Sequence, residues 1–172
     1  MISGTLLKFS VVNSLLALSI SGAIAATAPG SPLTLDIVNN ATLLDTVNAT
    51  ASHAAILRAQ ILLDRAHFSP GEIDASFGGN MRNAISAYQA NRDLAVSGVI
   101  DAATWASLNK DDLPVLSSYT ITDADVAGPF IAIPAGMLAK SKLPALAYAS
   151  PAEALGEKFH VSPRLLMQLN AG

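Results

Sequence analysis

Cysteine is absent from the 172-residue chain, and charged residues make up only 13% of it. The lack of cysteine excludes disulfides, thiolate nucleophiles and cysteine-ligated zinc, so packing must hold the fold together. Thirteen acidic residues outnumber ten basic ones, for a net charge of −3 at pH 7. An acidic chain does not suit nucleic acid or an anionic membrane surface, so we expect neither as a partner. Shape, hydrogen bonds and stacking are better candidates than charge for recognising a ligand.

Long apolar runs occur only near the N-terminus. Residues 1–25 carry one basic residue and then an apolar run that ends in the small-x-small sequence Ala23-Ile24-Ala25. This pattern is typical of a bacterial secretory signal peptide, which we predict over 1–25. An uncleaved membrane anchor is the alternative, but the run is short for a span and is broken by Asn13 and several serines. No later segment is long and apolar enough to cross a membrane.

Two stretches have the composition of connecting segments. Residues 26–52 are rich in Ala, Thr, Asn and Ser. We therefore predict a flexible spacer over 26–52, with a short helix near residues 43–47. Residues 110–118 are charged and contain a proline, and we predict a linker there.

Periodic apolar residues predict three helices between these two stretches. Apolar residues recur every three or four positions over 52–67, which predicts a helix with Ser52 as its N-cap. The same periodicity predicts a second helix over 80–93. Asp101 is expected to cap a short third helix.

The loops that follow the first two helices carry the same turn, Gly-x-Ile-Asp. Residues 57–74 align without gaps on residues 84–101, so each unit is a helix, a loop and a turn. One unit cannot bury its apolar face alone, whereas two units and a closing helix can. We therefore expect a mainly α chain with a three-helix bundle over 53–109. Structural roles are assigned to four turn residues, Gly71, Asp74, Gly98 and Asp101.

Neither catalysis nor metal binding is favoured by the polar residues. Asp74 and Asp101 are the candidate carboxylate pair for acid–base chemistry. However, Asp side chains in such turns bond backbone N–H groups, which accounts for both residues. No two of the three histidines have metal-ligand spacing, so no metal site is expected. Nothing else in the chain indicates a cofactor, and none is predicted.

A second module is expected over residues 119–172. It begins with the alternating stretch Tyr119–Thr122, which predicts a short strand. Two helices follow near its end, one capped by Ser150 with a proline at its first position and one capped by Ser162. This order of elements predicts an α+β module.

An ordered set of residues in the three-helix region matches the pattern of a known family. The matching residues are Gln60, Leu63, Ile73 to Gly78, Ala84, Ile85, Tyr88, Gln89, Leu94 to Asp101, Thr104, Trp105 and Leu108. With them, residues 55–108 resemble the peptidoglycan-binding domain type 1 of bacterial cell-wall enzymes. The family commonly has Gly after the first turn Asp, where this chain has Ala75. A positive φ is energetically less favourable for alanine than for glycine.

The second module also carries a resemblance. Its matching residues are Tyr119 to Thr122, Val126 to Phe130, Lys142 to Tyr148 and Glu153 to His160. They resemble the LysM-like segment that follows this domain in periplasmic L,D-transpeptidases, a strand, two helices and a closing strand. The closing strand is missing here, so we expect an incomplete, truncated LysM-like module. In those enzymes a catalytic domain with a Ser-His-Gly-Cys type motif follows. This chain has neither the motif nor a cysteine, so we expect no enzyme activity.

The resemblance implies a protein that binds peptidoglycan in the periplasm of a Gram-negative bacterium, through glycan or stem peptide. We expect it to be non-catalytic and monomeric. Loops 69–80 and 95–103 are expected to line a groove, because loops on a rigid scaffold carry binding. Tyr88 and Trp105 are expected in the core. If such a groove exists, Arg82 and Arg92 could meet a stem-peptide carboxylate, although solvated surface charge is the commoner role of an arginine and is favoured for both. The candidate binding residues are Phe77, Asn80, Arg82, Arg92 and Ser97.

Two other functions are compatible with the sequence. The chain is alternatively the N-terminal part of an L,D-transpeptidase cut short before its catalytic domain, which the DNA beyond Gly172 would reveal. The third hypothesis is an adaptor whose helical domain binds another envelope protein, which a pull-down without peptidoglycan would reveal.

Overall fold

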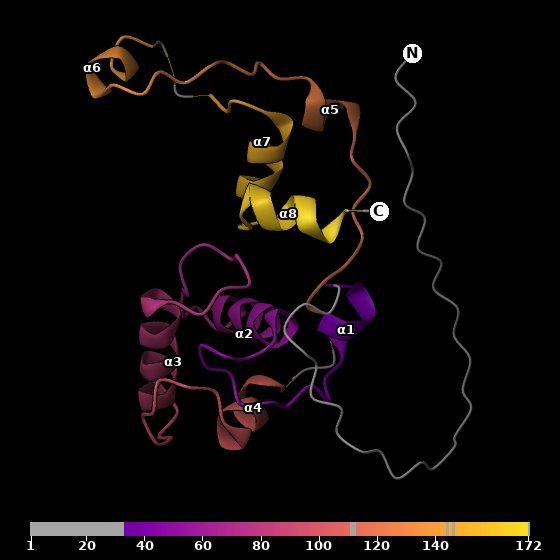
Figure 1. Ribbon diagram of the computed structural model, residues 1–172, viewed down its shortest axis with the longest axis vertical. Helices are drawn as coiled ribbons and strands as arrows, with labels where there is room; N and C mark the ends of the chain where they lie inside the picture. The colour runs from indigo at the N-terminus through magenta and orange to yellow at the C-terminus, as the bar shows by residue number, and fades with distance from the viewer. Residues whose placement is uncertain (1–32, 111–112, 144, 146, 172) are drawn as a thin grey trace, which may run out of the picture.

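The computed structural model describes residues 33–110, 113–143, 145 and 147–171 (Figure 1). Within these ranges the chain forms eight helices and no strand, so the fold is mainly α, as expected. The predicted signal peptide, residues 1–25, lies outside the described residues. The helices are α1 (Leu35–Asn39), α2 (His53–Arg65), α3 (Gly79–Asn91), α4 (Ala102–Leu108), α5 (Asp123–Val126), α6 (Met137–Lys140), α7 (Pro151–Lys158) and α8 (Pro163–Leu169).

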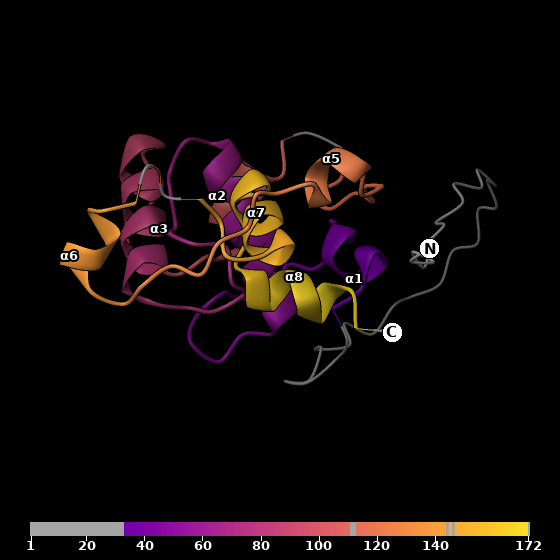
Figure 2. The same cartoon turned by 90° about the horizontal axis from the view of Figure 1, so that it is seen from above.

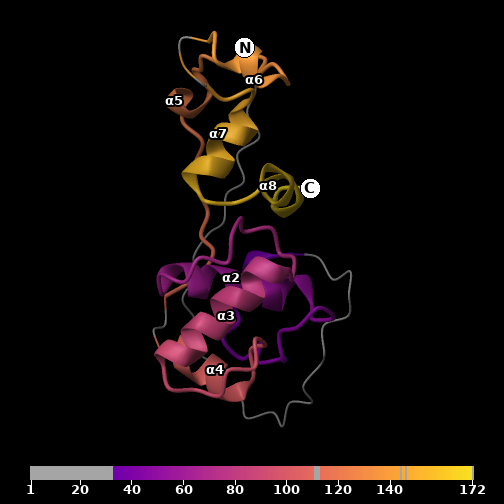
Figure 3. The ribbon, with the colours of Figure 1, turned by 90° about the vertical axis from the view of Figure 1, so that its left-hand side faces the viewer.

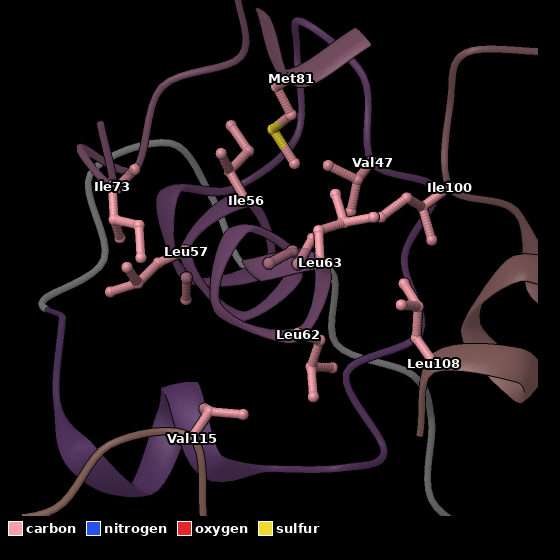
Figure 4. Packing of buried hydrophobic residues seen from close by; sticks show 14 of the residues in the cluster. Val47, Ile56, Leu57, Leu62, Leu63, Ile73, Met81, Ile100, Leu108 and Val115 are labelled. Atoms are coloured by element: carbon pink, nitrogen blue, oxygen red, sulfur yellow. The ribbon is translucent and has the colours of Figure 1, made fainter. Parts of the chain in front are cut away.

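Helix α2 is the centre of the hydrophobic core. Its predicted N-cap is confirmed, because the Ser52 hydroxyl accepts a hydrogen bond from the Ala55 N–H at 3.3 Å. The helix ends where His67 adopts a φ of 66° and the Phe68 N–H donates to the Leu63 carbonyl at 2.9 Å. Figure 4 shows side chains that gather round α2, among them Ile73, Met81, Ile100, Leu108 and Val115.

Helices α3 and α4 complete the bundle that the periodicity predicted. The buried apolar face of α3 carries Met81, Ala84, Ile85 and Tyr88. Trp105 of α4 is fully buried, and its Nε1–H donates to the Asp45 carbonyl at 2.9 Å. Tyr88 is 2% exposed, and its hydroxyl lies 2.8 Å from the Ser107 hydroxyl. The core positions predicted for Tyr88 and Trp105 are confirmed.

The segment before α2 differs from the expected flexible spacer over 26–52. Helix α1 packs on α2, and Val38 and Val47 are fully buried. Val47 exchanges two backbone hydrogen bonds with Ile100, at 2.9 and 3.1 Å. The described part of the segment, 33–52, is therefore packed, and the helix expected near residues 43–47 is wrong. Apolar residues are too irregularly spaced before Ser52 to reveal this burial in the sequence.

Part of the predicted linker, 110–118, also packs on the first module. Val115 is 7% exposed and belongs to the core cluster. The Asn39 side chain holds Leu116 twice, because Nδ2 donates to its carbonyl at 2.9 Å and Oδ1 accepts from its N–H at 2.8 Å. The chain before α2 and the chain after α4 are thus joined to each other beside α2.

The expected LysM-like α+β module is not supported. Residues Tyr119–Thr122 pair with no strand in the ranges that the structure describes. The polar groups of Thr122 instead bond the first turn of α5. The Asp125 carboxylate accepts hydrogen bonds from the Thr122 N–H and from the Thr122 hydroxyl, both at 2.8 Å. Lys158 of α7 forms an ion pair with Asp125 at 2.8 Å. The Lys158 ammonium first, and then the Thr122 donors, hold the pKa of Asp125 far below its ordinary value.

Helices α7 and α8 pack together and dock on the first module (Figures 2 and 3). The Ser162 N–H donates to the Ile73 carbonyl at 2.9 Å, and Val161 forms an isolated parallel bridge with Ile73. Leu165 of α8 is 1% exposed and joins the core of the first module. The second module therefore holds the loop that carries Ile73.

Candidate functional site

The first repeat loop is shaped by a buried amide. Gln60 of α2 is 1% exposed. Its Oε1 accepts from the N–H groups of Asp74 at 3.3 Å and Ala75 at 2.8 Å, and its Nε2 donates to Asp74 Oδ1 at 3.0 Å and the Ser76 carbonyl at 3.2 Å. Asp74 Oδ1 also accepts from the Ser76 N–H at 2.8 Å. This network holds Ala75 at a φ of 59°, the positive value that a glycine would accept more easily.

The second repeat loop is held by another buried amide. Gln89 of α3 is fully buried, and its Oε1 accepts from the N–H groups of Ser97 at 2.9 Å and Gly98 at 3.0 Å. Its Nε2 donates to Ser97 Oγ at 3.1 Å, the Val99 carbonyl at 2.8 Å and Thr104 Oγ1 at 3.0 Å. The loop therefore leads directly into α4.

Asp101 caps α4 through the same threonine. Its Oδ1 accepts from the Thr104 hydroxyl at 2.7 Å and from the Thr104 N–H at 2.8 Å. The hydroxyl first, and then the N–H, lower the pKa of Asp101 below its ordinary value. Asp74 and Asp101 are both engaged in turns of their own loops, so the geometry does not present them as a carboxylate pair for acid–base chemistry.

A shallow, open groove of about 510 Å³ lies beside the first repeat loop. One wall is the segment that follows α2, and the other is a face of α3 whose residues are three, four and seven positions apart. The polar groups are an imidazole, a hydroxyl and two carboxamides, and an aromatic ring and two alanines supply apolar surface. The lining residues are His67, Phe68, Ser69, Gly71, Asn80, Asn83, Ala84 and Ala87.

Only one of the five candidate binding residues lines this groove. Asn80 lies in it, next to Gly71. The guanidinium of Arg82 lies 5.7 Å from the ring centroid of the partly buried Phe77.

The other two candidates are also engaged elsewhere. The guanidinium of Arg92 lies 5.5 Å from the ring centroid of Tyr88. Ser97 bonds Gln89. The expectation that both repeat loops form the groove differs from the structure, because the loop 95–103 contributes none of the lining residues described.

Sequence reasoning missed His67 and Asn83 as lining residues. His67 is exposed just after the end of α2, and it lies in the groove wall. Asn83 lies three residues after Asn80 on α3, and this spacing was the available signal. The spacing alone does not predict a groove, because the groove also requires the loop after α2 to lie against that face of α3.

The structure offers no other obvious chemistry within the described ranges. No three His, Asp or Glu side chains gather there closely enough to hold a metal ion. No helix among the described residues is long and apolar enough to span a membrane. The arrangement can thus donate and accept hydrogen bonds and bury apolar surface.

One known protein family matches the three-helix bundle described above. Residues 52–108 match the model of a family described as "Putative peptidoglycan binding domain". The match starts at the N-cap of α2 and ends at the last residue of α4, so it covers the three-helix bundle and about a third of the chain. The chain therefore contains a peptidoglycan-binding domain of type 1. No curated protein matches the chain.

Proposed function

We propose that this protein is a non-catalytic peptidoglycan-binding protein of the bacterial envelope. One observation carries the proposal: the segment that matches the family is a folded body bearing an open groove with hydrogen-bonding side chains. Concave sites of this kind, part apolar with a few convergent polar groups, are typical of ligand binding. Binding would be non-covalent and of weak to moderate affinity, because the groove is shallow.

Other parts of the proposal rest on the sequence. An N-terminal stretch of signal-peptide type supports export. An exported protein that binds peptidoglycan would meet its ligand in the periplasm of a Gram-negative bacterium, which we propose as its location. The absence of cysteine supports a role without catalysis, since the nucleophile of L,D-transpeptidases is a cysteine. We propose that the protein acts as a monomer.

Sedimentation with insoluble peptidoglycan tests the proposed function. The purified protein is mixed with washed peptidoglycan sacculi and centrifuged, and the protein in the pellet is compared with an acidic control protein of similar size. We expect enrichment in the pellet that saturates as protein is added. Pelleting no greater than that of the control would reject peptidoglycan binding.

A further inference from the structure

The groove offers hydrogen bonds from groups that are mostly neutral. Its polar side chains are the imidazole of His67, the hydroxyl of Ser69 and the carboxamides of Asn80 and Asn83. The eight lining residues in the described part of the chain include no Lys, Arg, Asp or Glu. The ring of Phe68 adds apolar surface.

The two arginines considered as partners for a stem-peptide carboxylate do not line the groove. Arg82 and Arg92 extend over the rings of Phe77 and Tyr88 rather than lining the groove. Glu72 is an exposed acidic residue, and it directly follows Gly71 in the chain, which lines the groove. An anionic ligand in the groove would find no arginine or lysine partner among the lining residues described.

Peptidoglycan presents two chemically different surfaces. Its glycan carries hydroxyl and acetamido groups, which are uncharged donors and acceptors that match carboxamides and a hydroxyl. Its stem peptides carry free carboxylates, which proteins commonly bind with arginine. We infer that the groove takes the N-acetylated glycan rather than the stem peptide, an inference that rests on the proposed function.

Nuclear magnetic resonance titration of the whole protein tests this inference. One titration uses tetra-N-acetylchitotetraose, an uncharged probe, and the other uses a synthetic stem tetrapeptide. We expect the sugar to shift the amide signals of His67, Asn80 and Asn83, and the peptide to leave them unchanged. The sugar affinity should change little between low and high salt, because no ion pair is involved.

The outcomes separate this inference from the proposed function. Peptide-induced shifts of the groove signals overturn the inference, and so does a silent sugar titration for a protein that still pellets with peptidoglycan. A protein that does not pellet contradicts the proposed function, while sugar-induced shifts would still support the assignment of the groove.

A pair of substitutions on one helix localises the binding. Asn83 and Asn91 are both exposed on α3, but only Asn83 lines the groove. We expect Asn83→Ala to weaken the sugar affinity roughly three- to tenfold, the usual effect of losing a hydrogen bond. Asn91→Ala should leave it unchanged, and the amide spectrum of each variant reports whether it folds. Unchanged affinity in a folded Asn83→Ala protein would contradict the placement of the glycan in the groove.

Discussion

The two copies of the Gly-x-Ile-Asp turn have the same sequence pattern but different anchors. In the first copy, Gln60 binds the end of the turn, at Asp74 and Ala75. In the second copy, Gln89 binds the start of the turn, at Gly98 and the residue before it. A shared local motif therefore produces two loop shapes, because a buried amide reaches each loop from a different position.

The consequence is a division of roles between the loops. Asp74 closes a tight turn over Ser76, whereas Asp101 begins a helix. The groove borders the first copy, at Gly71, and the described residues of the second copy do not line it. Duplication thus supplied two similar supports for the core, and only one of them also borders the candidate binding surface.

The largest expected loss of stability follows from removing the side-chain amide that anchors each loop. Gln89→Ala leaves buried donors and acceptors of its loop unpaired, at about 1–3 kcal/mol for each group. We expect a loss of about 3 kcal/mol or more in unfolding free energy, measured by urea denaturation. Gln60→Ala should cost somewhat less, because Gln60 makes four hydrogen bonds to its loop, whereas Gln89 makes four to its loop and a fifth to Thr104 of α4. A cost below about 1 kcal/mol for Gln89→Ala would show that the amide does not shape its loop.

Alanine at the two turn glycines should separate stability from binding. Gly71 and Gly98 have φ values of 87° and 69°, so each substitution should cost about 1–2 kcal/mol. A Cβ on Gly98 would lie 2.9 Å from Arg82 Cγ, and a Cβ on Gly71 would lie 3.0 Å from Asn80 Nδ2. Because Asn80 lines the groove, Gly71→Ala should also weaken glycan binding, whereas Gly98→Ala should not. Equal binding by the two folded variants would contradict this distinction.

The dependence of stability on pH should reveal the capping role of Asp101. Its pKa is lowered in the folded state, so its charge stabilises the fold above the ordinary carboxyl pKa of about 4. This stabilisation is lost as the pH falls through the lowered pKa. Asn also caps helices well but does not titrate here, so Asp101→Asn should flatten the decline in melting temperature below about pH 4. A decline as steep as that of the parent protein would assign the acid sensitivity to other carboxylates, with Asp125 the first to examine.

The smallest expected effect comes from replacing the equivalent alanine of each copy with glycine, which should change the stability in opposite directions. Ala75 has a positive φ, so Ala75→Gly should relieve strain and stabilise the protein by up to about 1 kcal/mol, less what its buried Cβ contributes. Ala102, the equivalent residue, is the first residue of α4, so Ala102→Gly should destabilise by at most about 1 kcal/mol. Thermal unfolding of both variants measures the difference. Destabilisation of similar size in both would mean that the turn at Ala75 is not strained.

Much of the helical bundle could be predicted from the sequence. The caps Ser52, Asp101, Ser150 and Ser162 were identified, and each accepts a hydrogen bond from the N–H three residues later. These signals are local, because a cap and an apolar face involve residues only a few positions apart. Of the candidate binding residues, only Asn80 proved to line the groove.

The remaining features required contacts between distant residues. Polar composition indicated a spacer before α2, but Val38 and Val47 are buried against the core. Alternation indicated a strand at Tyr119–Thr122, but no neighbouring strand is described for it to pair with, and its side chains serve α5 instead. Composition and alternation report local preference, which tertiary contacts override.

The sequence by itself determined the main helices, their caps, the duplicated unit and the class of domain, because these depend on short-range periodicity and on spaced positions of one pattern. Only the tertiary structure decided where the groove lies and which residues line it. The pairing of Asn39 with Leu116 and of Ser162 with Ile73 joins segments about 80 to 90 residues apart. Such pairings depend on how the helices pack together, which no local pattern of residues encodes.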